Sequence, residues 1–108
     1  PAQYNLGTSY DYGQGVKRDP KIAVKLYILA AEQGFVLAQY NLGLKYATGD
    51  GVSESYTDAY IWWHIAATQG NKDALNNKEI LVKDMTPSKL LTAQRLAREC
   101  IENNYKGC

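Results

Sequence analysis

Apolar and small residues recur along the chain at steps of three and four, the spacing of one face of a helix. Ala2, Leu6 and Tyr10 form the first such row. The row ends at Gly13-Gln14-Gly15, where glycine tolerates the left-handed conformation that closes a helix. Asp19-Pro20 follows, and this pair favours a new helix because Asp caps it and Pro suits its first turn. The pattern therefore predicts two helices joined by a glycine-rich turn.

The same pattern returns after 36 residues. Residues 2–7 and 38–43 both read Ala-Gln-Tyr-Asn-Leu-Gly, and 15 of the 36 positions shared by 2–37 and 38–73 are identical. Typical residue frequencies would give roughly 2 identities by chance. A third unit, 74–108, is degenerate, with Met85-Thr86-Pro87 in place of the glycine turn. The sequence predicts one all-α solenoid of helix pairs whose atypical last unit caps the array.

Gly7 and Gly43 fall inside the first helix of their units, where glycine costs about 1 kcal/mol relative to alanine. We infer that the partner helix comes too close for a side chain at these positions. Small residues should allow the same approach from the other side, and large aromatic residues should fill the spaces between units. The small residues are Ala23, Ala30, Ala59 and Ala66, and the aromatic ones are Tyr10, Tyr27, Tyr46 and Trp63.

Composition excludes several classes of function. Lys and Arg number 12 against 11 Asp and Glu, so the chain lacks the clustered positive charge of a nucleic-acid groove. No run of apolar residues is long enough to span a membrane. The chain opens Pro-Ala-Gln-Tyr without Met, and we expect it to be part of a longer protein. The lack of a targeting segment is therefore uninformative.

The run from Ala2 to Val16, with Asp19, Ala23 and Ala30 to Gly34 after it, resembles the Sel-1-like repeat (SLR) family. The match recurs over Ala38 to Val52, Ala59 and Ala66 to Gly70. Tetratricopeptide repeats share part of this pattern but have a 34-residue period. The resemblance implies a right-handed superhelical scaffold that binds a protein or peptide on its concave face, without catalysis or cofactor. Many bacterial members act in envelope assembly, secretion or host contact, which favours a periplasmic or secreted location.

In arrays of this kind the first helix of each unit lines the concave side. With Ala2, Leu6 and Tyr10 packed inward, other residues of these helices are candidates for partner binding. They are Asn5, Thr8, Asp11, Tyr12, Asn41, Leu44, Lys45 and Thr48. An asparagine near this place bonds extended peptides in tetratricopeptide relatives, so Asn5 and Asn41 are candidate peptide contacts. The alternative is that each asparagine bonds the adjacent unit.

Cys100 and Cys108 are the only cysteines, eight residues apart. A bridge requires the chain to turn back after Asn104, which Gly107 permits. Cysteine-rich members of the resembled family use bridges of similar spacing, but two free thiols remain an alternative. Two thiols alone cannot form a structural zinc site, so no metal is expected.

His64 is the only histidine, and no nucleophile or metal motif accompanies it. We expect an ordinary helix residue here, and core packing rather than an exposed binding surface for Trp62 and Trp63. Two other functions stay open. One is implied by cysteine-rich members of the resembled family that are linked to β-lactam binding: it is the binding or hydrolysis of cell-wall or β-lactam compounds, with His64 as the residue to test. The other is a structural segment of a longer solenoid.

Overall fold

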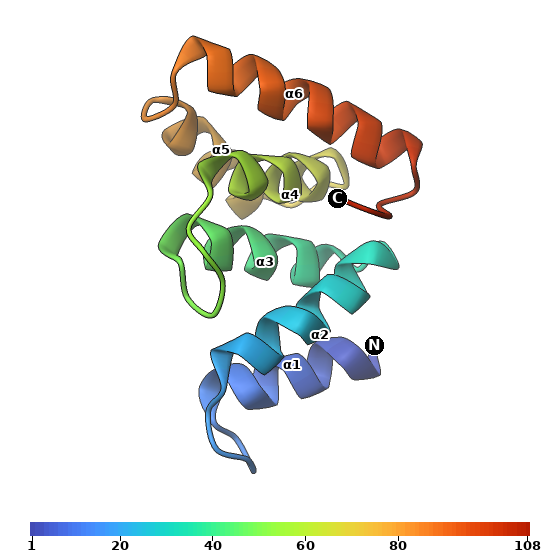
Figure 1. Ribbon diagram of the computed structural model, residues 1–108. Helices are drawn as coiled ribbons and strands as arrows, with labels where there is room; N and C mark the ends of the chain where they lie inside the picture. Colours follow the sequence, from blue (N-terminus) through green and yellow to red (C-terminus); the bar gives the residue numbers. More distant parts are fainter.

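The computed structural model describes residues 1–108 and is entirely helical (Figure 1). Its six helices are α1 (Ala2–Tyr12), α2 (Pro20–Glu32), α3 (Val36–Thr48), α4 (Tyr56–Thr68), α5 (Lys72–Val82) and α6 (Pro87–Glu102). They stack into an elongated body of 43 × 26 × 24 Å. This arrangement confirms the predicted solenoid of helix pairs. None of the helices combines the length and apolar character that crossing a membrane requires.

The helices begin and end at the predicted signals. The Asp19 carboxylate accepts hydrogen bonds from the first backbone N–H groups of α2, and the Thr86 hydroxyl accepts one from α6. Ser55 caps α4 in the same way. Gly13 and Gly49 adopt left-handed conformations, with φ of 69° and 70°, where α1 and α3 end. Side-chain caps and glycine stops thus position both helix pairs.

An aromatic ring packed on a glycine joins the helices of each of the first two pairs. A Cβ at Gly7 would lie 3.0 Å from the Tyr27 ring, and one at Gly43 would lie 2.3 Å from the Trp63 ring. The predicted close approach is confirmed, but its partner differs from the expectation. The four alanines are fully buried, yet the group that faces each glycine is an aromatic ring on the opposite helix.

The third pair does not form. Helices α5 and α6 both pack on α4 and make scarcely any contact with each other. Two sequence features explain this. At the position equivalent to Gly43, one period later, the third unit has Glu79 instead of glycine. Eight residues after its capping residue, α6 has Gln94, whereas α2 and α4 have the aromatic residues Tyr27 and Trp63 at the same distance from their caps. The turn over 83–86 is also shorter than the turn over 13–19. Without the glycine and the ring, α6 lies across α4 instead.

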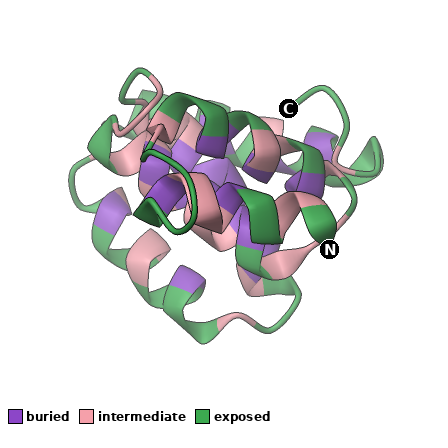
Figure 2. Ribbon diagram, turned by 90° about the horizontal axis from the view of Figure 1, so that it is seen from below, coloured by how far each residue is buried: buried purple, intermediate pink, exposed green.

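Burial differs between equivalent positions of the first two units. Leu42 is fully buried, whereas Leu6, one period earlier, is 47% exposed, and Ala2 is exposed where Ala38 is buried. The predicted inward packing of Ala2 and Leu6 is therefore wrong for the first unit. The reason is that α2 covers α3, whereas no helix covers the same face of α1. Figure 2 shows buried positions where helices face one another and exposed ones along the edges and loops.

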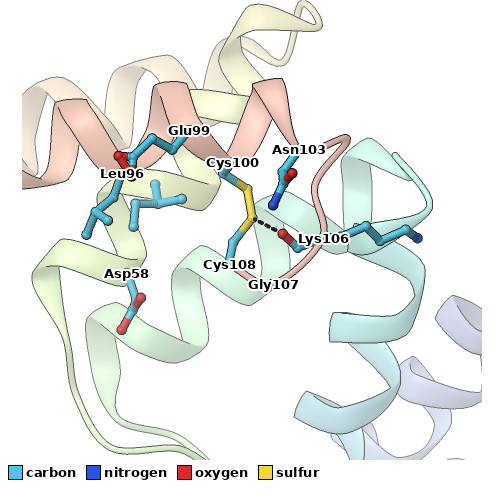
Figure 3. Close-up of a pocket in the computed structure, with 9 residues that line it drawn as sticks. Asp58, Leu96, Glu99, Cys100, Asn103, Lys106, Gly107 and Cys108 are labelled. Carbon is cyan, nitrogen blue, oxygen red and sulfur yellow. Dashed lines mark hydrogen bonds between the residues drawn. A yellow bond between two sulfur atoms is a disulfide. The ribbon is translucent and has the colours of Figure 1, made fainter.

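The C-terminal tail folds back across the stack. Cys100 and Cys108 form a disulfide, with their Cα atoms 5.6 Å apart (Figure 3). Of the two alternatives for these cysteines, the structure therefore has the bridge and not two free thiols. Within this loop Tyr105 lies against Gly34, and Lys106 Nζ donates a hydrogen bond of 3.0 Å to the Glu32 carbonyl oxygen. The tail therefore links the end of α6 to the end of α2.

We expect the disulfide to contribute measurably to stability. Closing a loop of this length removes unfolded-state entropy equivalent to about 2.5 kcal/mol. The exposed Cys108 should be replaced rather than the buried Cys100, because Cys108→Ser leaves no cavity. Urea unfolding should show a loss of about 2 kcal/mol on Cys108→Ser, and a similar loss when the wild type is reduced. A reductant should not affect the variant. Equal stability of the reduced and oxidised wild type would contradict this expectation.

Candidate functional site

A cleft of about 250 Å³ lies between α1 and α3. We call it the charged cleft. It is lined by Asp11, Tyr12, Arg18, Asn41, Leu44, Lys45, Thr48 and Asp50. The walls come from the last turns of α1 and α3 and from the glycine turns that follow them. Because the glycines end both helices at equivalent places, the two turns lie at the same end of the cleft.

Four charged side chains form a connected network in this cleft. The Lys45 ammonium bonds the Asp11 carboxylate and lies 2.9 Å from the Asp50 carboxylate. Arg18 reaches Asp50 at 2.8 Å and donates through Nε to the Asp11 carbonyl oxygen at 2.7 Å. Tyr27 donates its hydroxyl proton to the other Asp11 oxygen, at 2.9 Å. The network joins the first two units and carries no net charge.

Burial and pairing shift the pKa values of this network. Burial of Lys45 lowers its pKa, but the bonds to Asp11 and Asp50 outweigh burial, so the pKa stands above its usual value. The hydrogen bond from Lys45 holds the pKa of Asp50 below its usual value. Burial, and then the bond to Asp11, raises the pKa of Tyr27. Lys45 and Asp50 are therefore both ionised across the neutral range.

A second cleft, of about 260 Å³, lies between α3 and α5 and is mostly apolar. We call it the apolar groove. Its lining residues are Leu44, Ala47, Thr48, Trp63, Asn77, Ile80, Leu81 and Asp84. Ile80 is 54% exposed, whereas Trp63 is buried. Leu44 and Thr48 also line the charged cleft, so the two form one continuous surface over α1, α3 and α5.

The structure gathers most of the predicted binding residues at this surface. Asp11, Tyr12, Asn41, Leu44, Lys45 and Thr48 line the charged cleft, whereas Asn5 and Thr8 lie outside it. Inside the network, the Asp11 and Lys45 side chains are buried. The Asn41 amide donates to the Tyr4 hydroxyl at 3.3 Å, which agrees with a bond to the adjacent unit. The partner-binding role of these residues stays a prediction.

Sequence reasoning did not select the other residues of this surface, among them Arg18, Asp50, Asn77 and Ile80. Two of these had a signal. Ile80 stands one period after Leu44, and Asn77 stands one period after Asn41 and two after Asn5. No hydrogen bond joins the Asn77 side chain to the rest of the protein. Arg18 and Asp50 had no such signal, because the residue types at their positions differ between units and only the stacking of helices brings them together.

The aromatic residues of α4 behave as predicted. Trp62 and Trp63 are both buried, and the Trp63 indole N–H donates to the Tyr40 carbonyl oxygen at 3.0 Å. His64 is half-buried and contacts Lys78 rather than a carboxylate or a nucleophile. No three His, Cys, Asp or Glu side chains gather where they could hold a metal ion.

Comparison with known protein families agrees with the 36-residue period. The family model described as Sel1 repeat matches residues 1–35 and again residues 36–71. The chain belongs to the Sel1 repeat family. Both matched Sel1 repeats are the units in which a ring packs on a glycine, and the unmatched remainder holds the unpaired α5 and α6.

Two solved structures are similar to this Sel1 repeat chain. One is c5321, a protective antigen present in uropathogenic Escherichia coli strains and displaying an SLR fold. It is 36% identical over 96% of this chain, with a TM-score of 0.91. The other is a Sel1 repeat protein from Oxalobacter formigenes, 42% identical over 74% of this chain, with a TM-score of 0.72. This chain spans only 23% and 33% of their respective lengths.

A search of curated proteins found no match. Sel1 repeats generally mediate protein interactions, and proteins built from them are typically non-catalytic scaffolds. The fold by itself does not identify the partner, so function must be inferred from the surface of this chain.

Proposed function

We propose that this chain is a non-catalytic interaction module that binds an extended peptide segment across α1, α3 and α5. The observation that carries the proposal is the continuity of the charged cleft with the apolar groove through Leu44 and Thr48. An apolar side chain of the peptide can pack in the apolar groove, while the polar groups of the charged cleft fix the orientation of the peptide. Recognition sites usually combine these two kinds of surface.

Two details support this binding mode. Ile80 is largely exposed, next to the buried Trp63. An apolar side chain of the peptide that packs on Ile80 would remove the Ile80 surface from water, which favours binding. The Asn77 amide in the same groove is free to bond a peptide backbone, as an asparagine near this place does in tetratricopeptide relatives. Asn41, already bonded to Tyr4, suits a structural role instead.

A peptide-library selection against the chain, followed by affinity measurement, tests the proposal. We expect Ile80→Asp to weaken a selected peptide at least tenfold, because it places a charge where an apolar contact is needed. Leu29→Asp is the matched control, since Leu29 is similarly exposed but lies on α2. Peptides that bind both variants as well as the wild type would exclude this surface as the site.

A second role, as a segment of a longer solenoid, is favoured by the uncovered face of α1. Leu6 and Gly15 are open to solvent, whereas Leu42 is buried and Gly51 packs against Pro20 of the preceding unit. A further Sel1 helix pair would cover this face as α2 covers α3. Fusing a copy of residues 2–37 ahead of Ala2 should raise the stability of the chain, and Leu6→Lys in the fusion should cancel the gain. An unchanged stability of the fusion would count against this role.

A further inference from the structure

A further recess lies between α4 and α6, away from the surface described above. It measures about 390 Å³ and is lined by Tyr60, His64, Gln94, Arg98, Ile101 and Glu102. We call it the His64 groove. The His64 ring stacks on the Tyr60 ring, with centroids 5.7 Å apart and planes 7° from parallel. None of these residues lines the charged cleft or the apolar groove.

An uncompensated cation stands at the edge of this groove. Lys78 of α5 places Nζ 3.1 Å from His64 Nδ1 and 5.7 Å from the centre of the Tyr60 ring. A lysine ammonium can only donate, so Nδ1 accepts and the imidazole is neutral, with its proton on Nε2. Burial lowers the pKa of His64, and the nearby Lys78 charge lowers it further.

Lys78 differs in this respect from the other partly buried lysine of the protein. Lys45 is neutralised by two carboxylates, whereas no carboxylate lies within 4.0 Å of the Lys78 ammonium. Arg98 has no ion pair either. Lys78 is half-buried, and a carboxylate placed beside its ammonium would pair with a charge that the protein leaves without a counter-ion. The positive charge of Lys78 at the edge of the groove is therefore not paired with any carboxylate of the protein.

The other lining residues indicate which chemical groups a negatively charged ligand of this groove would carry. The lining holds one basic residue, Arg98, and one acidic residue, Glu102. Lys78, at the edge beside His64, adds one positive charge to them. Gln94 contributes a neutral donor. Ile101, 37% exposed, and the Tyr60 ring contribute apolar surface. A ligand that matches these features carries a carboxylate next to an aliphatic group.

We propose that the His64 groove binds a carboxylate borne on an apolar residue, as at the C-terminus of a peptide. Lys78 and Arg98 neutralise the carboxylate, Gln94 donates a hydrogen bond to it, and the side chain packs on Ile101 and Tyr60. This site is independent of the peptide surface over α1, α3 and α5, because the two share no residue.

The protein has a single histidine, so the imidazole C–H signals in its proton NMR spectrum all come from His64 and report on the groove. The probes are N-acetyl-leucine, which carries the carboxylate, and N-acetyl-leucinamide, which does not. We expect the acid alone to shift the His64 signals in a saturable manner. We also expect the acid to raise the pKa of His64, because a bound anion offsets the Lys78 charge. Equal effects of acid and amide, or no effect of either, would overturn the proposal.

Variants locate the binding. Lys78→Met keeps the length of the side chain and should weaken the acid at least tenfold, whereas Lys89→Met, at an exposed lysine near the start of α6, should change nothing. Arg98→Gln, at an exposed position, should weaken the acid several-fold and decides the outcome if Lys78→Met does not fold. Unchanged affinity in the folded variants would overturn the proposal. Ile80→Asp should leave this binding intact, so failure here is distinguishable from failure of the peptide surface.

Discussion

Gly43→Leu should lower the free energy of unfolding by about 3 kcal/mol or more. A Cβ at this position would lie 2.3 Å from the Trp63 ring, closer than non-bonded atoms approach. The ring cannot shift freely, because its N–H bonds the Tyr40 carbonyl oxygen of the same helix as Gly43. Overpacking of this kind costs about 1–3 kcal/mol, and a displaced indole would also lose a hydrogen bond worth about 1 kcal/mol.

Two alanine variants provide the matched comparison, measured by urea or thermal unfolding. Gly43→Ala and Gly7→Ala gain the same helix propensity, about 1 kcal/mol. They differ in the space available, since a Cβ at Gly7 lies 3.0 Å from the Tyr27 ring. We expect Gly7→Ala to be nearly neutral and Gly43→Ala to lose about 2 kcal/mol. If Gly43→Ala were as stable as the wild type, contact with Trp63 would not explain the glycine.

Lys45→Met should lower the free energy of unfolding by about 3 kcal/mol. The substitution keeps the volume of the side chain but leaves the buried Asp11 carboxylate without its ammonium partner. Breaking a buried pair on one side costs about 3–5 kcal/mol. We expect the lower end, because Tyr27 still donates to the Asp11 carboxylate and the Arg18 guanidinium lies 3.7 Å from it.

The control and the compensating variant separate charge from packing. Lys25→Met, at an exposed lysine, should change stability by less than about 0.5 kcal/mol. Adding Asp11→Asn to Lys45→Met should recover part of the loss, because it removes the unpaired charge. A double variant that loses the sum of the single losses would show that the two side chains do not interact.

The same pair has a pH signature. The pKa of Lys45 is raised in the folded protein, so its contribution is present below its usual pKa and is lost as pH rises through the folded value. The pKa of Asp50 is lowered, so its contribution is present above its usual pKa and is lost on acidification. The difference in stability between wild type and Lys45→Met should therefore be greatest between these limits.

Much of the fold could be predicted from the repeat itself. The period, the capping residues and the glycines at 7 and 43 each reflect a local rule of helix formation or packing, so they are visible in the sequence. Placement of α6 could not be predicted with the same certainty. A degenerate third unit is evident in the sequence, but only the competition between packing on α5 and packing on α4 decides where the last helix lies.

The candidate site divides along the same line. Asn41, Leu44 and Thr48 could be selected because a regular helix fixes which side chains share a face. Asp11 and Lys45 were selected as surface residues, yet they are buried as a pair, because the ion pair forms across 34 residues of sequence. Neither position repeats its residue in the next or preceding unit, so periodicity carries no trace of the pair.

By itself the sequence determined that this protein is a Sel1-type array, because a residue pattern that repeats must repeat its helices and turns. Only the tertiary structure decided which faces stay open. Leu6 and Leu42 have the same neighbours in sequence but opposite exposure, and His64 and Lys78 meet because α5 packs on α4. Such contacts depend on which elements compete for the same surface, and no local pattern encodes that competition.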